Sequence, residues 1–204
     1  MIEPAHNVEQ QPWVIHLPRS VKMTPEQFWE ACQLNRDVRL ELTAQGDLII
    51  MPPTGARTGT RNARLIHQVT QWADTDASGV AFDSSTGFEL PNGAIRSPDV
   101  AWVRRTRLAG VLPEGLDRFL PLCPDFVVEL KSPSDRLATV QEKMREYIAN
   151  GAQLGWLIDP GRRGVDVYRS DGSVERVDQP TRLAGDPVLP GFVLDLIPIW
   201  EPGV

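Results

Sequence analysis

The hydrophobic and polar positions along the chain follow two periods, and each period predicts a different kind of element. Short runs that are rich in β-branched and aromatic residues, and that end at proline, glycine or serine, predict strands. Apolar residues that recur every three or four positions predict amphipathic helices. The predicted strand regions are a hairpin over 38–51, an antiparallel meander over 79–103, single strands over 125–131 and 154–159, and a hairpin over 164–177. The predicted helices start after Thr24, where Thr24 and Gln27 are expected to form a capping box, at about residue 57 and at about residue 135.

The order of these elements predicts the fold class. A helix over 135–149 lies between two strongly apolar strands and is long enough for a right-handed crossover, which makes those strands parallel. The hairpins pair their own strands antiparallel. We therefore predict a mixed α/β domain.

The beginning of the chain differs from the rest. Residues 1–20 follow neither period and predict a flexible lead-in, with one short extended piece at Trp13-Val14-Ile15. The remaining residues, 21–204, predict a single domain, because a chain of 204 residues has the length of one ordinary domain with small extensions. Hydrophobic residues make up 41% and charged residues 24% of the chain, which is the composition of a globular protein.

Charge and cysteine content narrow the function classes. A formal net charge of −6 argues against a general affinity for nucleic acid, although it is compatible with a local basic cleft. Cys32 and Cys123 lie too far apart to form a metal-binding motif. The chain has no signal peptide and no apolar run near about 18 residues, so we predict a cytoplasmic protein with no membrane partner.

The candidate chemistry starts from charged residues inside two of the apolar strands. Asp99 begins one strand, and Glu129-Leu130-Lys131 ends another. A charged side chain is costly to bury unless it is paired or binds a metal. Glu129 and Lys131 are two positions apart, so they share one face of the strand while Leu130 points into the core. If the two strands are neighbours, two carboxylates converge on a site that suits Mg²⁺, with a lysine beside it, and these parts serve phosphodiester hydrolysis.

Three further side chains are candidates for the same site, and plainer alternatives stay open. Glu41 points away from its leucine neighbours, and is either an exposed strand glutamate or a third acidic group at the metal site. Lys143 and Tyr147 lie four positions apart, on one side of a predicted helix. Lys143 either reaches back over the carboxylates or forms an ordinary pair with a nearby glutamate or with solvent.

A basic stripe is the candidate surface for nucleic-acid binding. Arg57, Arg61 and Arg64 recur at helical spacing on the polar side of the helix over 57–73. The stripe is either a phosphate-contacting surface or a solvated polar face.

Several short motifs follow one another in order over roughly residues 24–200. They are Arg39-Leu40-Glu41-Leu42 with Gly46, Met51-Pro52-Pro53, Ser97-Pro98-Asp99-Val100, the run from Val127 to Asp135, Lys143 with Tyr147, Gly151, and Trp156-Leu157-Ile158-Asp159-Pro160. Together they resemble the Uma2 family (DUF820), which falls within the PD-(D/E)XK nuclease superfamily. The resemblance implies a single nuclease-like domain over 21–204, with a restriction-endonuclease-like mixed β-sheet flanked by helices.

The resemblance also implies roles for these residues. Asp99, Glu129 and the main-chain carbonyl of Leu130 would bind Mg²⁺, or alternatively Mn²⁺, and Lys131 would stabilise or activate the attacking water. Glu41 would match the upstream acidic position of the family, and Lys143 and Tyr147 would match its helix position. The implied activity is metal-dependent endonucleolytic cleavage of DNA, with RNA as a further possible substrate. Cleavage of both strands of a duplex would suit a homodimer.

Two other function classes stay open. The first is a non-catalytic nucleic-acid-binding or structural protein on the same fold, which would bind no metal at Asp99 and Glu129. The second is a hydrolase that uses these two carboxylates as an acid/base pair, as glycosidases do. Lys131 disfavours the second class, because an ammonium so close to Glu129 would keep that carboxylate ionised.

Overall fold

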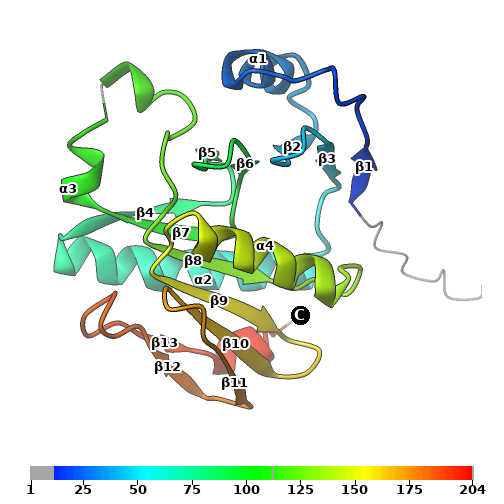
Figure 1. Ribbon diagram of the computed structural model, residues 1–204. Helices are drawn as coiled ribbons and strands as arrows, with labels where there is room; N and C mark the ends of the chain where they lie inside the picture. The colour runs from blue at the N-terminus through cyan, green and yellow to red at the C-terminus, as the bar shows by residue number, and fades with distance from the viewer. Residues whose placement is uncertain (1–11, 112, 204) are drawn as a thin grey trace, which may run out of the picture.

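The structure, a computed structural model, describes residues 12–111 and 113–203, which form two main sheets and their helices (Figure 1). The five-stranded sheet contains, in spatial order, β1 (Trp13–Ile15), β3 (Leu48–Met51), β2 (Arg39–Leu42), β6 (Ile95–Arg96) and β5 (Phe88–Glu89). The six-stranded sheet contains β11 (Val174–Asp178), β10 (Gly164–Arg169), β9 (Leu154–Asp159), β8 (Phe126–Leu130), β7 (Val100–Arg104) and β4 (Gly79–Asp83). A small pair consists of β12 (Arg182–Ala184) and β13 (Val193–Asp195). The helices are α1 (Pro25–Leu34), α2 (Ala56–Asp76), α3 (Arg105–Leu108), α4 (Leu137–Ala149), α5 (Ile197–Trp200) and a 3-10 turn at Pro113–Gly115.

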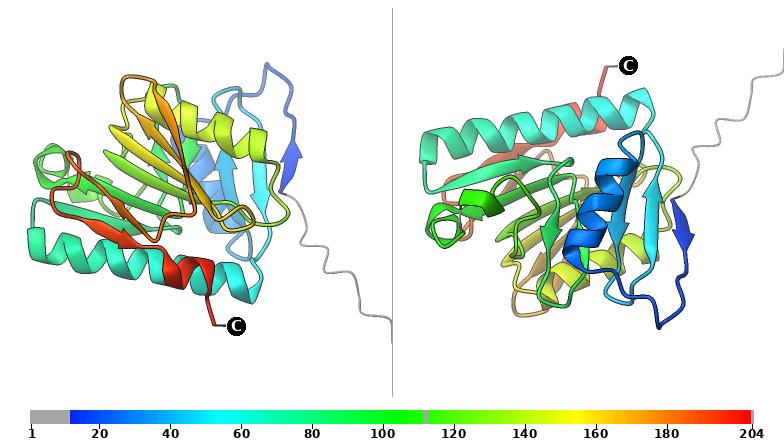
Figure 2. Two further views of the ribbon diagram at one scale, coloured as in Figure 1. Left: turned by 90° about the horizontal axis from the view of Figure 1, so that it is seen from below. Right: turned by 90° about the horizontal axis from the view of Figure 1, so that it is seen from above.

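The six-stranded sheet is covered on both faces, which explains why its central strands are apolar throughout (Figure 2). One face packs against α2 and the C-terminal segment through alternate residues such as Val100, Trp102 and Val128. The other face packs against α4 through the residues between them, such as Ala101 and Val127. Successive side chains of a strand therefore face different helices. Glu129, two positions after Val127, is on the face that packs against α4.

The crossover from β8 through α4 to β9 has the predicted form. β8 and β9 pair in parallel, and α4 ends at Ala149, where the predicted helix also ends. The predicted capping box of α1 is also present, with Thr24 accepting from the Gln27 amide and the Gln27 side chain accepting from the Thr24 amide. These elements confirm the mixed α/β class, with a mixed sheet flanked by helices.

The predicted meander over 79–103 is wrong in one respect. β4 pairs directly with β7, whereas β5 and β6 form a hairpin in the five-stranded sheet, where Ile95 pairs with Leu42 of β2. Pro98 lies in the segment between β6 and β7, and a residue without an amide hydrogen favours the end of one hydrogen-bonded strand before the next begins. This segment brings the two sheets together at Asp99.

The start of the described chain forms the edge of the five-stranded sheet. The predicted extended piece is β1, which pairs antiparallel with β3. Residues 1–11, the larger part of the predicted lead-in, lie outside the described residues, and the domain boundary at residue 21 stays a prediction. Within the described ranges, every helix is too short or too polar to cross a membrane.

Candidate active site

Asp99, directly before β7, and Glu129, near the end of β8, are close neighbours. The two strands pair antiparallel with Val100 opposite Val128, so the register brings Asp99 to the position of Glu129. The backbone amide of Leu130 donates a hydrogen bond of 2.8 Å to Oδ2 of Asp99. The two strands that the sequence analysis required to be adjacent are adjacent, and their carboxylates line one cavity.

Asn62 of α2 holds the second oxygen of Asp99. Its side-chain amide donates to Oδ1 of Asp99 at 3.0 Å. The carbonyl oxygen of the same Asn62 side chain is buried and has no hydrogen-bond partner among the described residues. A buried acceptor without a partner is unusual in folded proteins and indicates room for a donor, a water or a cation beside Asp99.

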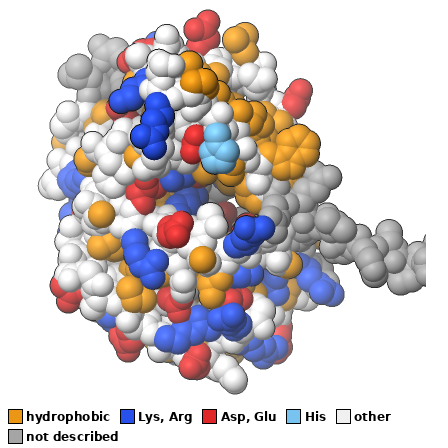
Figure 3. Space-filling view, turned by 45° about the vertical axis from the view of Figure 1, so that its right-hand side comes forward, with side chains coloured by type: hydrophobic (Ala, Val, Ile, Leu, Met, Phe, Trp, Pro, Cys, Tyr) orange, Lys and Arg blue, Asp and Glu red, His pale blue; other side chains and the backbone are white. Residues whose placement is uncertain are grey.

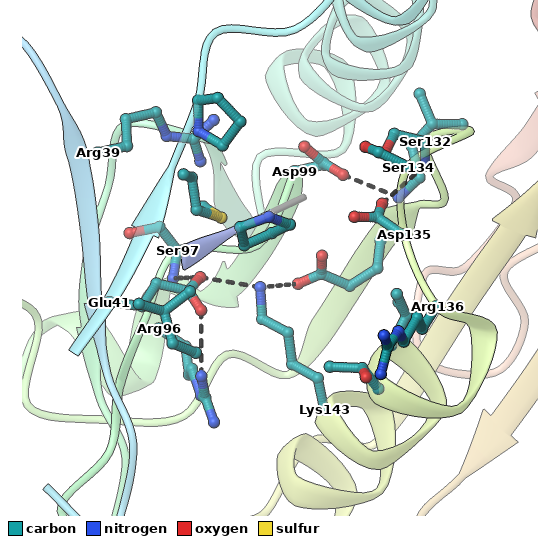
Figure 4. A pocket seen from close by; sticks show the side chains of 18 of the residues that line it. Arg39, Glu41, Arg96, Ser97, Asp99, Ser132, Ser134, Asp135, Arg136 and Lys143 are labelled. Atoms are coloured by element: carbon teal, nitrogen blue, oxygen red, sulfur yellow. Dashed lines mark hydrogen bonds and ion pairs between the residues drawn. The ribbon is translucent and has the colours of Figure 1, made fainter. Parts of the chain in front are cut away.

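Lys143 lies between two carboxylates (Figure 4). Its ammonium nitrogen Nζ is 2.8 Å from Oε1 of Glu41 and 2.8 Å from Oε1 of Glu129. Tyr147, one helical turn later on α4, donates its hydroxyl hydrogen to the same Glu129 oxygen at 3.0 Å. The predicted helix pair therefore does reach back over the β8 carboxylate, and Lys143 pairs with two distant glutamates rather than with solvent.

Glu41 is buried, so the alternative of an exposed strand glutamate is excluded. Besides Lys143, it accepts from the guanidinium of Arg96 at 3.1 Å and from the backbone amide of Ser97 at 2.9 Å. Arg96 in turn donates to Glu146 of α4 at 2.7 Å. This chain of ion pairs joins the five-stranded sheet to α4, and it orients Lys143 toward Glu129.

These carboxylates line a cavity of about 620 Å³, to which both sheets and α4 contribute residues. Figure 3 shows a hollow in the molecular surface, with acidic and basic side chains close together around it. Among the described residues that line the cavity are six acidic and four basic side chains. The acidic ones are Glu41, Asp99, Glu129, Asp135, Glu142 and Glu146, and the basic ones are Arg39, Arg96, Arg136 and Lys143. When all are ionised, the lining has an excess of two negative charges, which is the charge of one divalent cation.

Raised pKa values of two of these carboxyl groups indicate that the excess of negative charge is unfavourable. Burial, together with the nearby carboxylates of Asp99 and Glu41, raises the pKa of Glu129 to about 7, although Lys143 opposes the shift. Burial also raises the pKa of Asp99. Burial acts in the same direction on Glu41, but Lys143 and Arg96 hold the pKa of Glu41 below its ordinary value. Burial would lower the pKa of Lys143, but Glu129 and Glu41 raise it, so this lysine stays charged.

The donor set fits Mg²⁺ or Mn²⁺. Asp99 and Glu129 supply carboxylate oxygens, and Leu130 also lines the cavity, as its predicted role as a main-chain ligand requires. Among residues 12–111 and 113–203, no three His, Cys, Asp or Glu side chains could hold a metal by themselves. Mg²⁺ does not need such a cage, because it commonly binds through one or two carboxylates and completes its shell with water and substrate phosphate.

Lys131 does not reach these carboxylates. Its ammonium donates to the carbonyl of Ser132 at 2.9 Å, and Lys131 is not one of the described residues that line the cavity. β8 ends at Leu130, and the chain turns at Pro133-Ser134. The alternation that would place Lys131 on the same face as Glu129 therefore does not continue to Lys131. In the structure, Lys143 has the position that the sequence analysis assigned to Lys131.

The basic stripe on α2 lies outside the cavity. Arg57 and Arg64 are exposed, and Arg61 donates to the carbonyl of Ile199 at 2.8 Å, which holds α2 against α5. None of the three is among the described lining residues. Arg61 therefore has a structural contact, and the phosphate-contacting role of the stripe stays a prediction.

Sequence reasoning missed three residues of the site: Asn62, Arg96 and Arg39. Arg96 carried the clearest signal, since it is a charged residue inside the short apolar strand that precedes Ser97-Pro98-Asp99. Asn62 and Arg39 gave no local signal, because polar residues are common along one face of a helix and at alternate positions of a strand.

The Arg96 contacts predict a large stabilising role. We expect Arg96→Ala to lower the free energy of unfolding by about 3 kcal/mol, because Glu41 and Glu146 lose a buried partner. The matched control is Arg169→Ala, which removes an exposed pair with Glu175 and should cost less than about 1 kcal/mol. Urea unfolding followed by circular dichroism measures both values. Equal losses in the two variants would contradict the structural role of Arg96.

Comparisons with known proteins agree with this fold. A family model named Uma2 and described as "Putative restriction endonuclease" matches residues 25–197. A solved structure, described as a putative nuclease belonging to DUF820 from Anabaena variabilis ATCC 29413, has a TM-score of 0.70 and 19% sequence identity. The similarity covers 88% of this chain and 98% of that chain, and at this identity it concerns the fold. No curated protein matches.

Proposed function

The chain belongs to the Uma2 family, and we propose that it is a metal-dependent endonuclease that hydrolyses phosphodiester bonds of DNA. One observation carries the proposal. Asp99 and Glu129 converge in a cavity whose lining has two more negative than positive charges, beside the ammonium of Lys143. Holding the carboxylates of Asp99 and Glu129 together, largely withdrawn from water, is costly without a cation, and a divalent ion would offset their charge.

The proposed chemistry follows from charge. A bound Mg²⁺ or Mn²⁺ would supply a Lewis acid that offsets the negative charge developing on the attacked phosphate. Asp99 and Glu129, with the Leu130 carbonyl, would hold that ion. Asn62 and the Leu130 amide fix the carboxylate of Asp99, and Tyr147 fixes that of Glu129, so both ligands are oriented before substrate binds.

A positive group beside the carboxylates would stabilise the phosphate and position the attacking water. The contacts favour Lys143 for this role, and Glu41 would orient it. The role that the resemblance implies for Lys131 would require its side chain to leave the Ser132 carbonyl and turn toward Glu129. Both assignments are proposals that substitutions can separate.

The remaining assignments are finer parts of the same proposal. The family description supports a nucleic-acid substrate, with DNA proposed and RNA as the second possible substrate. Arg57, Arg61 and Arg64 would meet phosphates outside the cavity. A homodimer would present two such cavities to the two strands of a duplex, and a cytoplasmic location would suit this substrate.

Cleavage of a mixed panel of DNA and RNA, with and without Mg²⁺, tests the proposal. We expect cleavage in Mg²⁺ or Mn²⁺ and none after removal of the metal with a chelator, with activity restored when the metal is added back. The control is the Asp99→Asn protein purified in parallel, which reveals contaminating nuclease. Binding of nucleic acid by the wild-type protein that is the same with and without Mg²⁺, with no cleavage, would assign the chain to the non-catalytic nucleic-acid-binding class instead.

A further inference from the structure

The reactive groups of the cavity are recessed. The side chains of Glu41, Glu129 and Lys143 expose only 2%, 10% and 14% of their surfaces. A phosphate that contacts them must enter the cavity, which brings the sugar and base that it joins to the cavity walls. The cavity volume of about 620 Å³ lies in the range of pockets that enclose small organic ligands. This is room for a nucleotide unit rather than for a stack of paired bases.

The two walls of the cavity differ in chemistry. The wall from β1, β3 and the loop after it is apolar and consists of Val14, Ile49, Met51, Pro52 and Pro53. The opposite wall, from the β8–α4 loop and the start of α4, is rich in hydroxyl groups from Ser132, Ser134 and Thr139. A base has apolar faces, whereas a sugar–phosphate backbone has oxygens that accept hydrogen bonds. The walls are therefore complementary to the two sides of one nucleotide.

Positive groups lie on both sides of the carboxylates. Arg39 of β2 and Arg136 at the start of α4 flank Asp99 from opposite directions in the cavity (Figure 4). The guanidinium of Arg39 is held by the carbonyl of Ser84 at 2.6 Å, so its position is set before any ligand arrives. A strand that places one phosphate at Asp99 and Glu129 would bring its neighbouring phosphates toward these two arginines.

We propose that the substrate enters as an unpaired strand: one base lies against the apolar wall, its phosphate lies at Asp99 and Glu129, and the flanking phosphates meet Arg39 and Arg136. The substrate class is thus single-stranded nucleic acid, including loops and frayed ends. This inference rests on the proposed nuclease function. A base inside a duplex cannot take this position, because its two faces are stacked and its edge is paired.

Binding tests the inference separately from cleavage. The probes are fluorescein-labelled DNA of about 12 nucleotides, the same DNA annealed to its complement, and the matching RNA, with Ca²⁺ in place of Mg²⁺. We expect the wild-type protein to bind the single-stranded DNA about tenfold more tightly than the duplex, measured by fluorescence anisotropy. Equal or tighter binding of the duplex would overturn the inference. The RNA probe shows whether the sugar matters for an unpaired strand.

Two neighbouring substitutions on β1 test the apolar wall. Val14 and Ile15 are similarly exposed, at 48% and 44%, but they point to opposite faces of the strand, and only Val14 is among the described lining residues. We expect Val14→Asn to weaken binding of the single strand by about threefold and to leave duplex binding unchanged, because the base loses apolar contact. Ile15→Asn is the matched control and should bind like the wild type. Equal effects of the two substitutions would refute the contact.

Cleavage of a DNA hairpin provides the second readout. With Mg²⁺ present, we expect cuts within an unpaired loop of about 10 nucleotides and few in the stem. Cuts that fall mainly in the stem would overturn the inference while supporting the nuclease proposal. If no nucleic acid is cut, the nuclease proposal fails, and the binding preference for the unpaired strand still decides the inference.

Discussion

Replacing Asp99 by asparagine is expected to lower Mg²⁺-dependent cleavage by about 100-fold or more, because one of the two carboxylates that would hold the metal loses its charge. The change is small in shape. The introduced side chain could still accept from the Leu130 amide through its oxygen, and rotation of the Asn62 side chain would turn its unpartnered oxygen toward the new amide. The fold should therefore survive, and circular dichroism can confirm it.

Metal binding provides the second readout for Asp99→Asn. Titration calorimetry with Mn²⁺ should show binding by the wild-type protein and a loss of at least about tenfold in affinity for the variant. Glu142→Gln is the matched control, because it makes the same change from a carboxyl group to an amide. Glu142 also lines the cavity, but its side chain is exposed. Wild-type cleavage and metal affinity in Asp99→Asn would remove Asp99 from the proposed site.

Replacing Lys143 by methionine is expected to have the other largest effect, a loss of cleavage of about 100-fold or more. The substitution keeps most of the side-chain length but removes the ammonium between Glu41 and Glu129. It should also lower the free energy of unfolding, because two buried carboxylates lose a charged partner. Single-turnover cleavage assays and urea unfolding measure the two effects.

A second substitution separates folding from chemistry at this position. Lys143→Arg keeps a positive charge between the two glutamates and should keep the fold. The planar guanidinium distributes its charge differently from an ammonium, so we expect cleavage to fall by about tenfold. A Lys143→Met protein that stays folded and cuts as fast as the wild type would exclude Lys143 from the reaction.

Lys131→Met is the matched control for Lys143→Met, and it also tests the role that the Uma2 resemblance implies. From the contact of Lys131 with the Ser132 carbonyl, we expect cleavage to stay within about threefold of the wild type. A loss as large as that of Lys143→Met would assign the water-positioning role to Lys131. It would also show that this side chain moves when substrate binds.

The sequence alone determined the local elements and the two acidic positions. The apolar runs around Asp99 and Glu129 predicted two strands, and the periodicity of 135–149 predicted the helix between parallel β8 and β9. The capping box of α1 could also be predicted from the sequence. These features could be predicted because hydrophobic periodicity, caps and turns depend on residues that are close in sequence.

Only the tertiary structure decided which side chains complete the site. Glu41 and Lys143 are 102 residues apart, and no local pattern indicates that they meet. The alternation of side chains along a strand suggested Lys131 as the lysine beside Glu129. This alternation holds only while the strand continues, and β8 ends at Leu130. The hairpin of β5 and β6 belongs to the five-stranded sheet, and Pro98 separates it from β7. This arrangement brings the guanidinium of Arg96 to the carboxylate of Glu41. Such contacts depend on how whole sheets and helices pack against one another. The alternation of residues along one strand carries no information about that packing.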